Sequence, residues 1–63
     1  MNKSIFEGKW KQIRGEAIIW WGKLTDDDLD KVKGNYDKLI GLLQKAYGYT
    51  QQQAEEEFEK RIK

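Results

Sequence analysis

The stretch Trp21-Gly22-Lys23-Leu24-Thr25-Asp26-Asp27-Asp28-Leu29 contains both the end of one predicted helix and the start of the next. Gly22 is suited to the left-handed conformation that closes a helix. Thr25 can accept a hydrogen bond from the backbone of the following turn, and the three aspartates favour the positive end of a helix dipole. Leu24 and Leu29 are spaced to pack across this cap as a hydrophobic staple. The stretch therefore predicts a tight connection between two helices, which is an αα-hairpin.

Upstream of this connection, apolar residues recur at steps of three and four, which is the spacing of one helix face. Ser4 and Glu7 have the spacing of a capping box. The sequence thus predicts a first helix over about residues 5–21. The apolar face consists of Phe6, Trp10, Ile13, Ala17, Trp20 or Trp21, and Leu24.

Downstream, the same start and stop signals recur. Gly34 is predicted to end a short second helix, and Asn35 can cap a third helix that ends at Gly48. Thr50 repeats the cap of the second helix and predicts a fourth helix over about residues 51–62. We therefore expect an all-α fold in which four short helices form two crossed αα-hairpins, a small orthogonal bundle. The expected core comprises Trp10, Ile13, Trp21, Leu29, Val32, Leu39, Ile40, Leu43, Tyr47 and Phe58.

The amino-acid composition excludes several classes of protein and of functional site. The 63 residues provide for a single domain over residues 1–63, and 12 basic against 11 acidic residues leave a net charge of +1. This near balance argues against a general nucleic-acid binder. The absence of Cys and His excludes disulfides, thiolate or histidine metal sites and His-dependent catalysis. No apolar run reaches the roughly 18 residues of a membrane span, so we expect a soluble intracellular domain.

Several motifs together resemble the bacterial CsbD-like family. They are Gly8-Lys9-Trp10-Lys11-Gln12, the stretch 21–29 quoted above, Leu39-Ile40-Gly41, Tyr47-Gly48-Tyr49 and Gln53-Ala54-Glu55. The resemblance covers nearly the whole chain. It implies a small cytoplasmic protein of four short helices that is associated with bacterial general stress responses. It implies no established molecular activity, cofactor or catalytic residue.

Residues 16–21 depart from the pattern of this family, whose members usually carry Lys, Glu and Gln among the apolar positions there. At about 100° per residue, Ile18 and Ile19 fall well outside the apolar face of the first helix. The C-terminal half of this helix is therefore apolar almost all round, and a domain this small rarely encloses a helix completely. Gly15 adds a place where another backbone could approach closely.

The sequence thus predicts a protein-binding surface on the first helix, formed by Ile18, Ile19, Trp20 and Trp21 with Ile5 and Gly15 at its rim. Trp20 would be the anchor, and the partner is either another protein or a second copy in a homodimer. The plainer alternative places Trp20 in the core and leaves one isoleucine exposed without a role. Apolar changes confined to one helix are also what binder design on a natural scaffold produces, so an engineered origin is a further hypothesis.

Other functions receive less support. The acidic run of Asp26, Asp27, Asp28 and Asp30 lacks the glycine and the bidentate glutamate of a calcium loop, so we expect no metal site. Residues 1–24 carry five cations and two anions around Trp10, which favours at most weak, salt-sensitive contact with nucleic acid. Membrane contact would be secondary, and no catalytic constellation is present, so we expect neither an enzyme nor a cofactor. The alternative function is that of an unmodified stress-response protein with a soluble protective or weak nucleic-acid-associated role.

Overall fold

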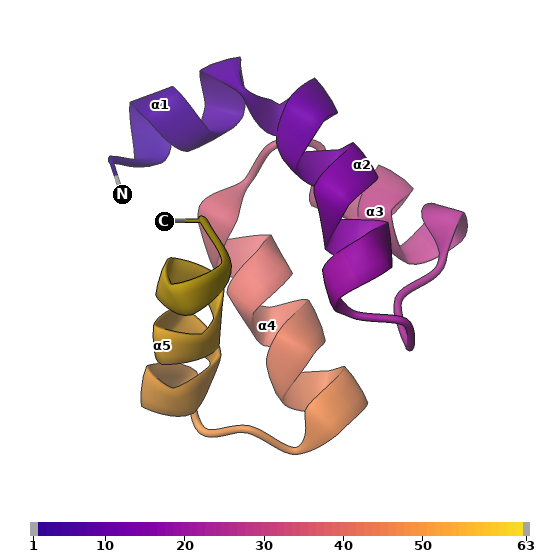
Figure 1. Ribbon diagram of the computed structural model, residues 1–63, viewed down its shortest axis with the longest axis vertical. Helices are drawn as coiled ribbons and strands as arrows, with labels where there is room; N and C mark the ends of the chain where they lie inside the picture. Colours follow the sequence, from indigo (N-terminus) through magenta and orange to yellow (C-terminus); the bar gives the residue numbers. More distant parts are fainter. Residues whose placement is uncertain (1, 63) are drawn as a thin grey trace.

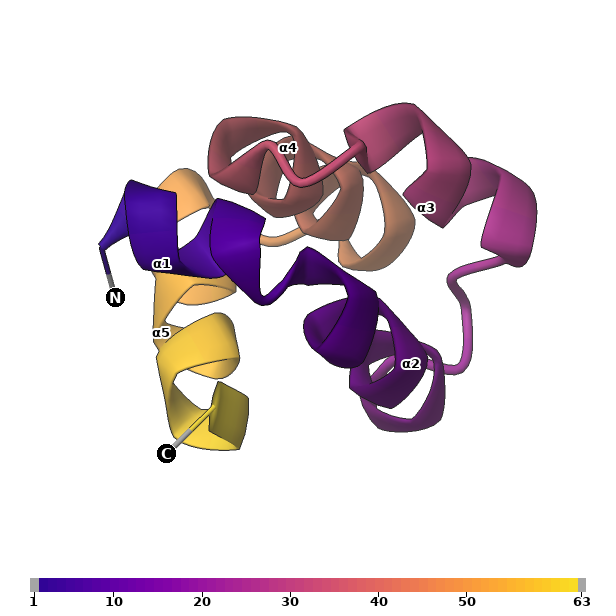
Figure 2. The same cartoon turned by 90° about the horizontal axis from the view of Figure 1, so that it is seen from above.

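The computed structural model describes residues 2–62, and within this range the chain is all-helical, as predicted (Figure 1). The five helices are α1 (Lys3–Gly8), α2 (Trp10–Trp20), α3 (Asp26–Val32), α4 (Tyr36–Tyr47) and α5 (Gln51–Ile62). Helices α4 and α5 form the C-terminal hairpin, α3 contacts α4, and α1 crosses above them. Figure 2 shows α2 continuing down the side of the bundle beneath α3.

The predicted first helix is divided at Lys9 into two helices, α1 and α2. Lys9 has φ −104° and ψ 11°, although its N–H still donates to the carbonyls of Ile5 and Phe6 at 3.0 and 3.2 Å. Gly34 lies inside this bend, where an added Cβ would be 3.4 Å from the Cβ of Trp10. Because Gly8 has no side chain, the backbone can bend there at little cost and wrap α1 over the core.

The N-terminal cap also differs from the prediction. The Asn2 side chain accepts the N–H of Ser4 at 2.7 Å, so Asn2, and not Ser4, is the cap. The helix begins at Lys3, which puts Ser4 inside its first turn.

The caps of the later helices are confirmed. Asp28 donates its N–H to the Thr25 hydroxyl at 3.1 Å, and Thr25 donates its N–H to the Asp28 carboxylate at 3.2 Å. Thr50 and Gln53 make the equivalent pair at the start of α5, at 3.1 and 2.9 Å. The Asn35 side chain caps α4. These reciprocal bonds satisfy backbone donors that a helix start leaves without partners.

The three glycines predicted to end helices differ in backbone conformation. Gly34 and Gly48 have φ values of 79° and 71°, as a left-handed end requires. Lys33 precedes Gly34 as the C-cap of α3 and is itself left-handed, with φ 51°. Gly22 does not adopt a positive φ, so its predicted role is wrong. Helix α2 instead ends at Trp20, and its C-cap Trp21, with φ −123° and ψ 86°, leads the chain out of the helix.

The core is organised around the ring of Phe58, which is fully buried. Its centroid lies 5.5 Å from that of Tyr36, 5.6 Å from that of Phe6 and 6.4 Å from that of Trp21. The buried apolar residues of the core are Phe6, Ile13, Ala17, Trp21, Leu24, Leu29, Val32, Leu39, Ile40, Leu43, Ala54 and Phe58. Trp10 and Tyr47, which we expected in the core, are only partly buried at its edge.

Candidate protein-binding surface

Helix α2 distributes the predicted surface residues over different environments. Ile19 is 80% exposed, whereas Ile18 and Trp20 are partly buried and pack against the core. Successive helical residues point about 100° apart, so Ile18 and Trp20 turn to opposite flanks when Ile19 points outward. The exposed apolar surface is therefore centred on Ile19, and its two neighbours supply only its edges.

Trp21 lies in the core rather than on the predicted surface, because it is only 2% exposed. Its ring stacks on Phe58 with an interplanar angle of 17°, and the Trp20 ring meets it edge-on at 5.5 Å. Trp20 is thus held against the molecule by Trp21, which leaves part of Trp20 accessible beside Ile19.

The two predicted rim residues, Ile5 and Gly15, lie in different places. Gly15 is on α2, one turn before Ile19, and an added Cβ there would meet nothing within 4 Å. Ile5 is 50% exposed but belongs to α1, beyond the bend (Figures 1 and 2). The structure therefore brings Gly15 together with Ile19 and leaves Ile5 apart from them.

Arg14 fastens one flank of α2 to α3. Its guanidinium donates to the Asp30 carboxylate and to the Asp26 carbonyl oxygen, and it lies 3.6 Å from the Asp26 carboxylate. The hydrogen bond to Asp30 is the main cause that raises the pKa of Arg14. The Trp10 ring packs 5.4 Å from that of Phe6. Arg14 and Trp10 lie in the segment that we considered for nucleic-acid contact, and both side chains are engaged in contacts within the fold.

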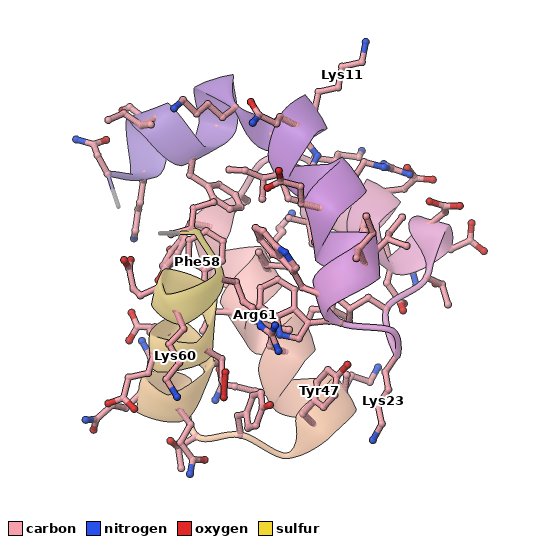
Figure 3. The ribbon with its side chains drawn as sticks, in the orientation of Figure 1. Lys11, Lys23, Tyr47, Phe58, Lys60 and Arg61 are labelled. Atoms are coloured by element: carbon pink, nitrogen blue, oxygen red, sulfur yellow. The ribbon has the colours of Figure 1, made fainter. Side chains whose placement is uncertain are left out.

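The two other charged residues of α2 are Lys11, which is exposed, and Glu16, which is partly buried. Lys11 and Glu16 make no ion pair or side-chain hydrogen bond with any residue in the range 2–62. Figure 3 shows the Lys11 side chain pointing away from the molecule. The outward face of α2, which we define as Lys11, Gln12, Gly15, Glu16 and Ile19, thus combines one large apolar side chain with opposite charges that have no internal partner.

One contact between segments that are distant in the sequence was not predicted. Lys23 donates its N–H to the Tyr47 hydroxyl at 3.3 Å, and its Nζ lies 5.0 Å from the centroid of the Tyr47 ring (Figure 3). The Tyr47 ring stacks on that of Tyr49 at 5.4 Å. Tyr47 therefore connects the turn after α2 to the end of α4. The available signal was the hydroxyl of Tyr47, because a tyrosine beside a core usually keeps its polar end at the surface.

An open groove of about 650 Å³ lies on another side of the molecule, between α1 and α5. Its lining comprises Lys3, Tyr36, Gln52, Glu55, Glu56, Glu59 and Lys60. Burial is the main cause that raises the pKa of Tyr36, and the charges of Glu55, Glu59 and Asp37 add to it. The glutamates of α5 were not predicted to line a groove, although glutamates three and four residues apart share a helix face.

Neither a metal cluster nor a membrane span is found in the part of the chain that the structure describes. Between residues 2 and 62, no group of three or more His, Cys, Asp or Glu side chains is placed to hold a metal ion. Of the aspartates considered for calcium, Asp28 caps α3, and Asp26 and Asp30 contact Arg14. No helix in this range has both the length and the apolar composition needed to cross a bilayer.

Comparison with known proteins identifies the family. The profile of CsbD-like proteins matches residues 5–56. The chain is 51% identical over 57 residues to a UPF0337 protein of Bordetella pertussis, covering 90% of this chain and 86% of that protein. It is 49% identical over 57 residues to the UPF0337 protein YjbJ of Escherichia coli K12, covering 90% and 83%. No solved structure matches the chain. With its helical fold and a match over most of its length, the chain belongs to the CsbD-like family.

Proposed function

We propose that this CsbD-like protein acts without catalysis, by binding another protein through the outward face of α2. The setting that its family implies is the cytoplasm of a bacterium and its general stress response. The observation that carries the proposal is the exposure of Ile19, which is 80% accessible in the middle of that face.

The surroundings of Ile19 distinguish it from an ordinary exposed isoleucine. Single exposed apolar residues are common and need no explanation. Here Ile19 is held on a regular helix, with Gly15 leaving the surface low on one side and partly buried Ile18 and Trp20 extending the apolar edge. Full burial of an isoleucine contributes about 1.5–3 kcal/mol, which is the scale of a binding hot spot.

Cross-linking in cells tests the proposal even when the partner is unidentified. A photo-reactive amino acid replaces Ile19 in one variant and Gln52, which is exposed on α5, in a matched control. We expect one discrete protein adduct from position 19 that mass spectrometry can identify, and no such adduct from position 52. Identical adduct patterns from both positions, or none from position 19, would refute the proposal.

The Ile19→Lys variant tests whether Ile19 lies on the surface or contributes to the core. Because the side chain is largely in water, the free energy of unfolding should change by no more than about 0.5 kcal/mol. Its helical circular dichroism and melting temperature should match those of Gln52→Lys, which adds the same charge elsewhere. If Ile19→Lys unfolds the chain, Ile19 belongs to the core and the proposed surface does not exist.

The alternative role, soluble protection or weak association with nucleic acid, predicts a different measurement. Affinity for DNA should then fall steeply as salt is added, because phosphate contacts release counterions. The pairing of Arg14 with aspartates and the packing of Trp10 against Phe6 favour protein binding over this alternative. The hypothesis of an engineered origin is not needed for either role.

A further inference from the structure

We propose that the partner on the outward face of α2 is a second copy of this chain, with the two α2 helices packed side by side in parallel. The proposal rests on the function proposed above, because it uses the same face and names its occupant. It is carried by the order of apolar, small and charged residues on that face.

The centre of the face has the arrangement of a short helix-pairing seam. Gln12 and Ile19 are seven residues apart, and Gly15 lies between them. At about 100° per residue these three positions fall within about 60° of one another. All three are exposed. A seven-residue repeat keeps one face of a helix against a partner helix, and a glycine in the seam lets two backbones come close.

The charges lie on the two flanks of this seam. Lys11 and Glu16 are about 140° apart around the helix, so Gly15 and Gln12 separate them and they do not pair within one chain. They are five residues apart, which is about 7.5 Å along the axis. Neither has an ionic partner among residues 2–62.

The orientation of the second copy follows from these charges. A two-fold axis parallel to the helices places the left flank of one helix against the right flank of the other. Lys11 of each copy then faces Glu16 of the other copy, giving two ion pairs of the kind that sets partner choice in parallel coiled coils. In the antiparallel arrangement each flank meets its own equivalent, so Lys11 would face Lys11 and Glu16 would face Glu16. The parallel pair is therefore the arrangement that these charges favour.

The size of the face limits the affinity. Stable interfaces bury about 800 Å² per partner, and the accessible surface of the described chain is 4306 Å². The face of an 11-residue helix is smaller than a stable interface requires, and α1 bends away from it at Lys9. We therefore expect a weak dimer, with a Kd on the order of 0.1–1 mM.

Disulfide trapping tests the contact directly, because the chain has no cysteine of its own. In the Gln12→Cys variant the two introduced thiols would face each other across the seam, within the roughly 4–7 Å between Cα atoms that a disulfide needs. We expect mild oxidation to convert this variant to covalent dimer at least about tenfold faster than Gln52→Cys, its matched control on α5. Equal rates for the two variants would overturn the proposal.

Charge reversal tests the orientation. Sedimentation equilibrium at low salt should show that Lys11→Glu and Glu16→Lys each weaken dimerisation by about tenfold, since each single change replaces both ion pairs with repulsions. The double variant Lys11→Glu/Glu16→Lys should return to within about threefold of the original Kd. Unaltered circular dichroism checks that each variant folds. If the double variant stays as weak as the single variants, the parallel arrangement is wrong.

The two proposals fail in distinguishable ways. If the original chain stays monomeric to about 2 mM while position 19 cross-links to a different protein in cells, the second copy is wrong and protein binding stands. If position 19 cross-links to nothing and the chain stays monomeric, both proposals are wrong. A cross-linked adduct of twice the mass of the chain supports both.

Discussion

Replacing Phe58 with leucine should remove the aromatic contacts at the centre of the core while keeping an apolar side chain there. Phe58 is fully buried, and its ring contacts those of Phe6, Tyr36 and Trp21. An aromatic pair contributes about 0.5–1.5 kcal/mol beyond the area it buries, and the three pairs are not fully additive. A change of shape in a packed core adds up to about 1.5 kcal/mol. We expect Phe58→Leu to lower the free energy of unfolding by about 2–3 kcal/mol.

This loss is large for so small a domain, because a single core of this size supplies only about 3–5 kcal/mol. A change of 1 kcal/mol shifts the melting temperature of such a domain by about 4–8 °C, so Phe58→Leu should melt roughly 10–20 °C lower. Thermal melts followed by circular dichroism at 222 nm measure the shift, and urea unfolding followed by tryptophan fluorescence measures the free energy.

The matched control is Ile19→Ala, which removes an apolar side chain that is 80% exposed. It should change the free energy of unfolding by no more than about 0.5 kcal/mol. A shift for Phe58→Leu below about 4 °C, or one no larger than that of Ile19→Ala, would show that the ring cluster does not hold the two hairpins together.

Four further substitutions test separate parts of the fold. Gly34→Ala should destabilise the protein by about 1–2 kcal/mol in urea, because it places a Cβ at φ 79° and 3.4 Å from Trp10. Gly22→Ala should be neutral or stabilising by up to about 1 kcal/mol, because Gly22 has no positive φ and no neighbour within 4 Å of an added Cβ; equal losses at both glycines would contradict this account. Thr25→Ala should cost about 1 kcal/mol through loss of the reciprocal cap of α3, and an unchanged urea midpoint would count against that cap. Burial raises the pKa of Tyr36, so the folded state holds the phenolic proton more tightly than the unfolded state. The contribution of the Tyr36 hydroxyl to the free energy of unfolding is therefore complete below pH ~10 and is lost as the pH rises further. We expect the urea midpoint of Tyr36→Phe to fall less steeply at alkaline pH than that of the original chain.

The local elements of this protein are determined by short-range features of the sequence. Thr25 with Asp28 and Thr50 with Gln53 start helices because each pair satisfies its own backbone donors within one turn. Gly34 and Gly48 adopt the left-handed conformation that costs glycine little. The exposure of Ile19 was likewise predictable, because its position on the helix lies off the apolar face. These features involve residues at most a few positions apart, so the sequence contains all the information they need.

Tertiary contacts decided the features that the sequence left open. The sequence predicted one helix running through Lys9, whereas the structure bends it there, beside Gly34, which is distant in sequence and packs against Trp10. The sequence placed Trp21 both in the expected core and on the predicted surface, and in the structure its ring stacks on Phe58 in the core. These outcomes depend on which surfaces of distant helices meet, and periodicity within one helix carries no information about the shape of the surface that covers it.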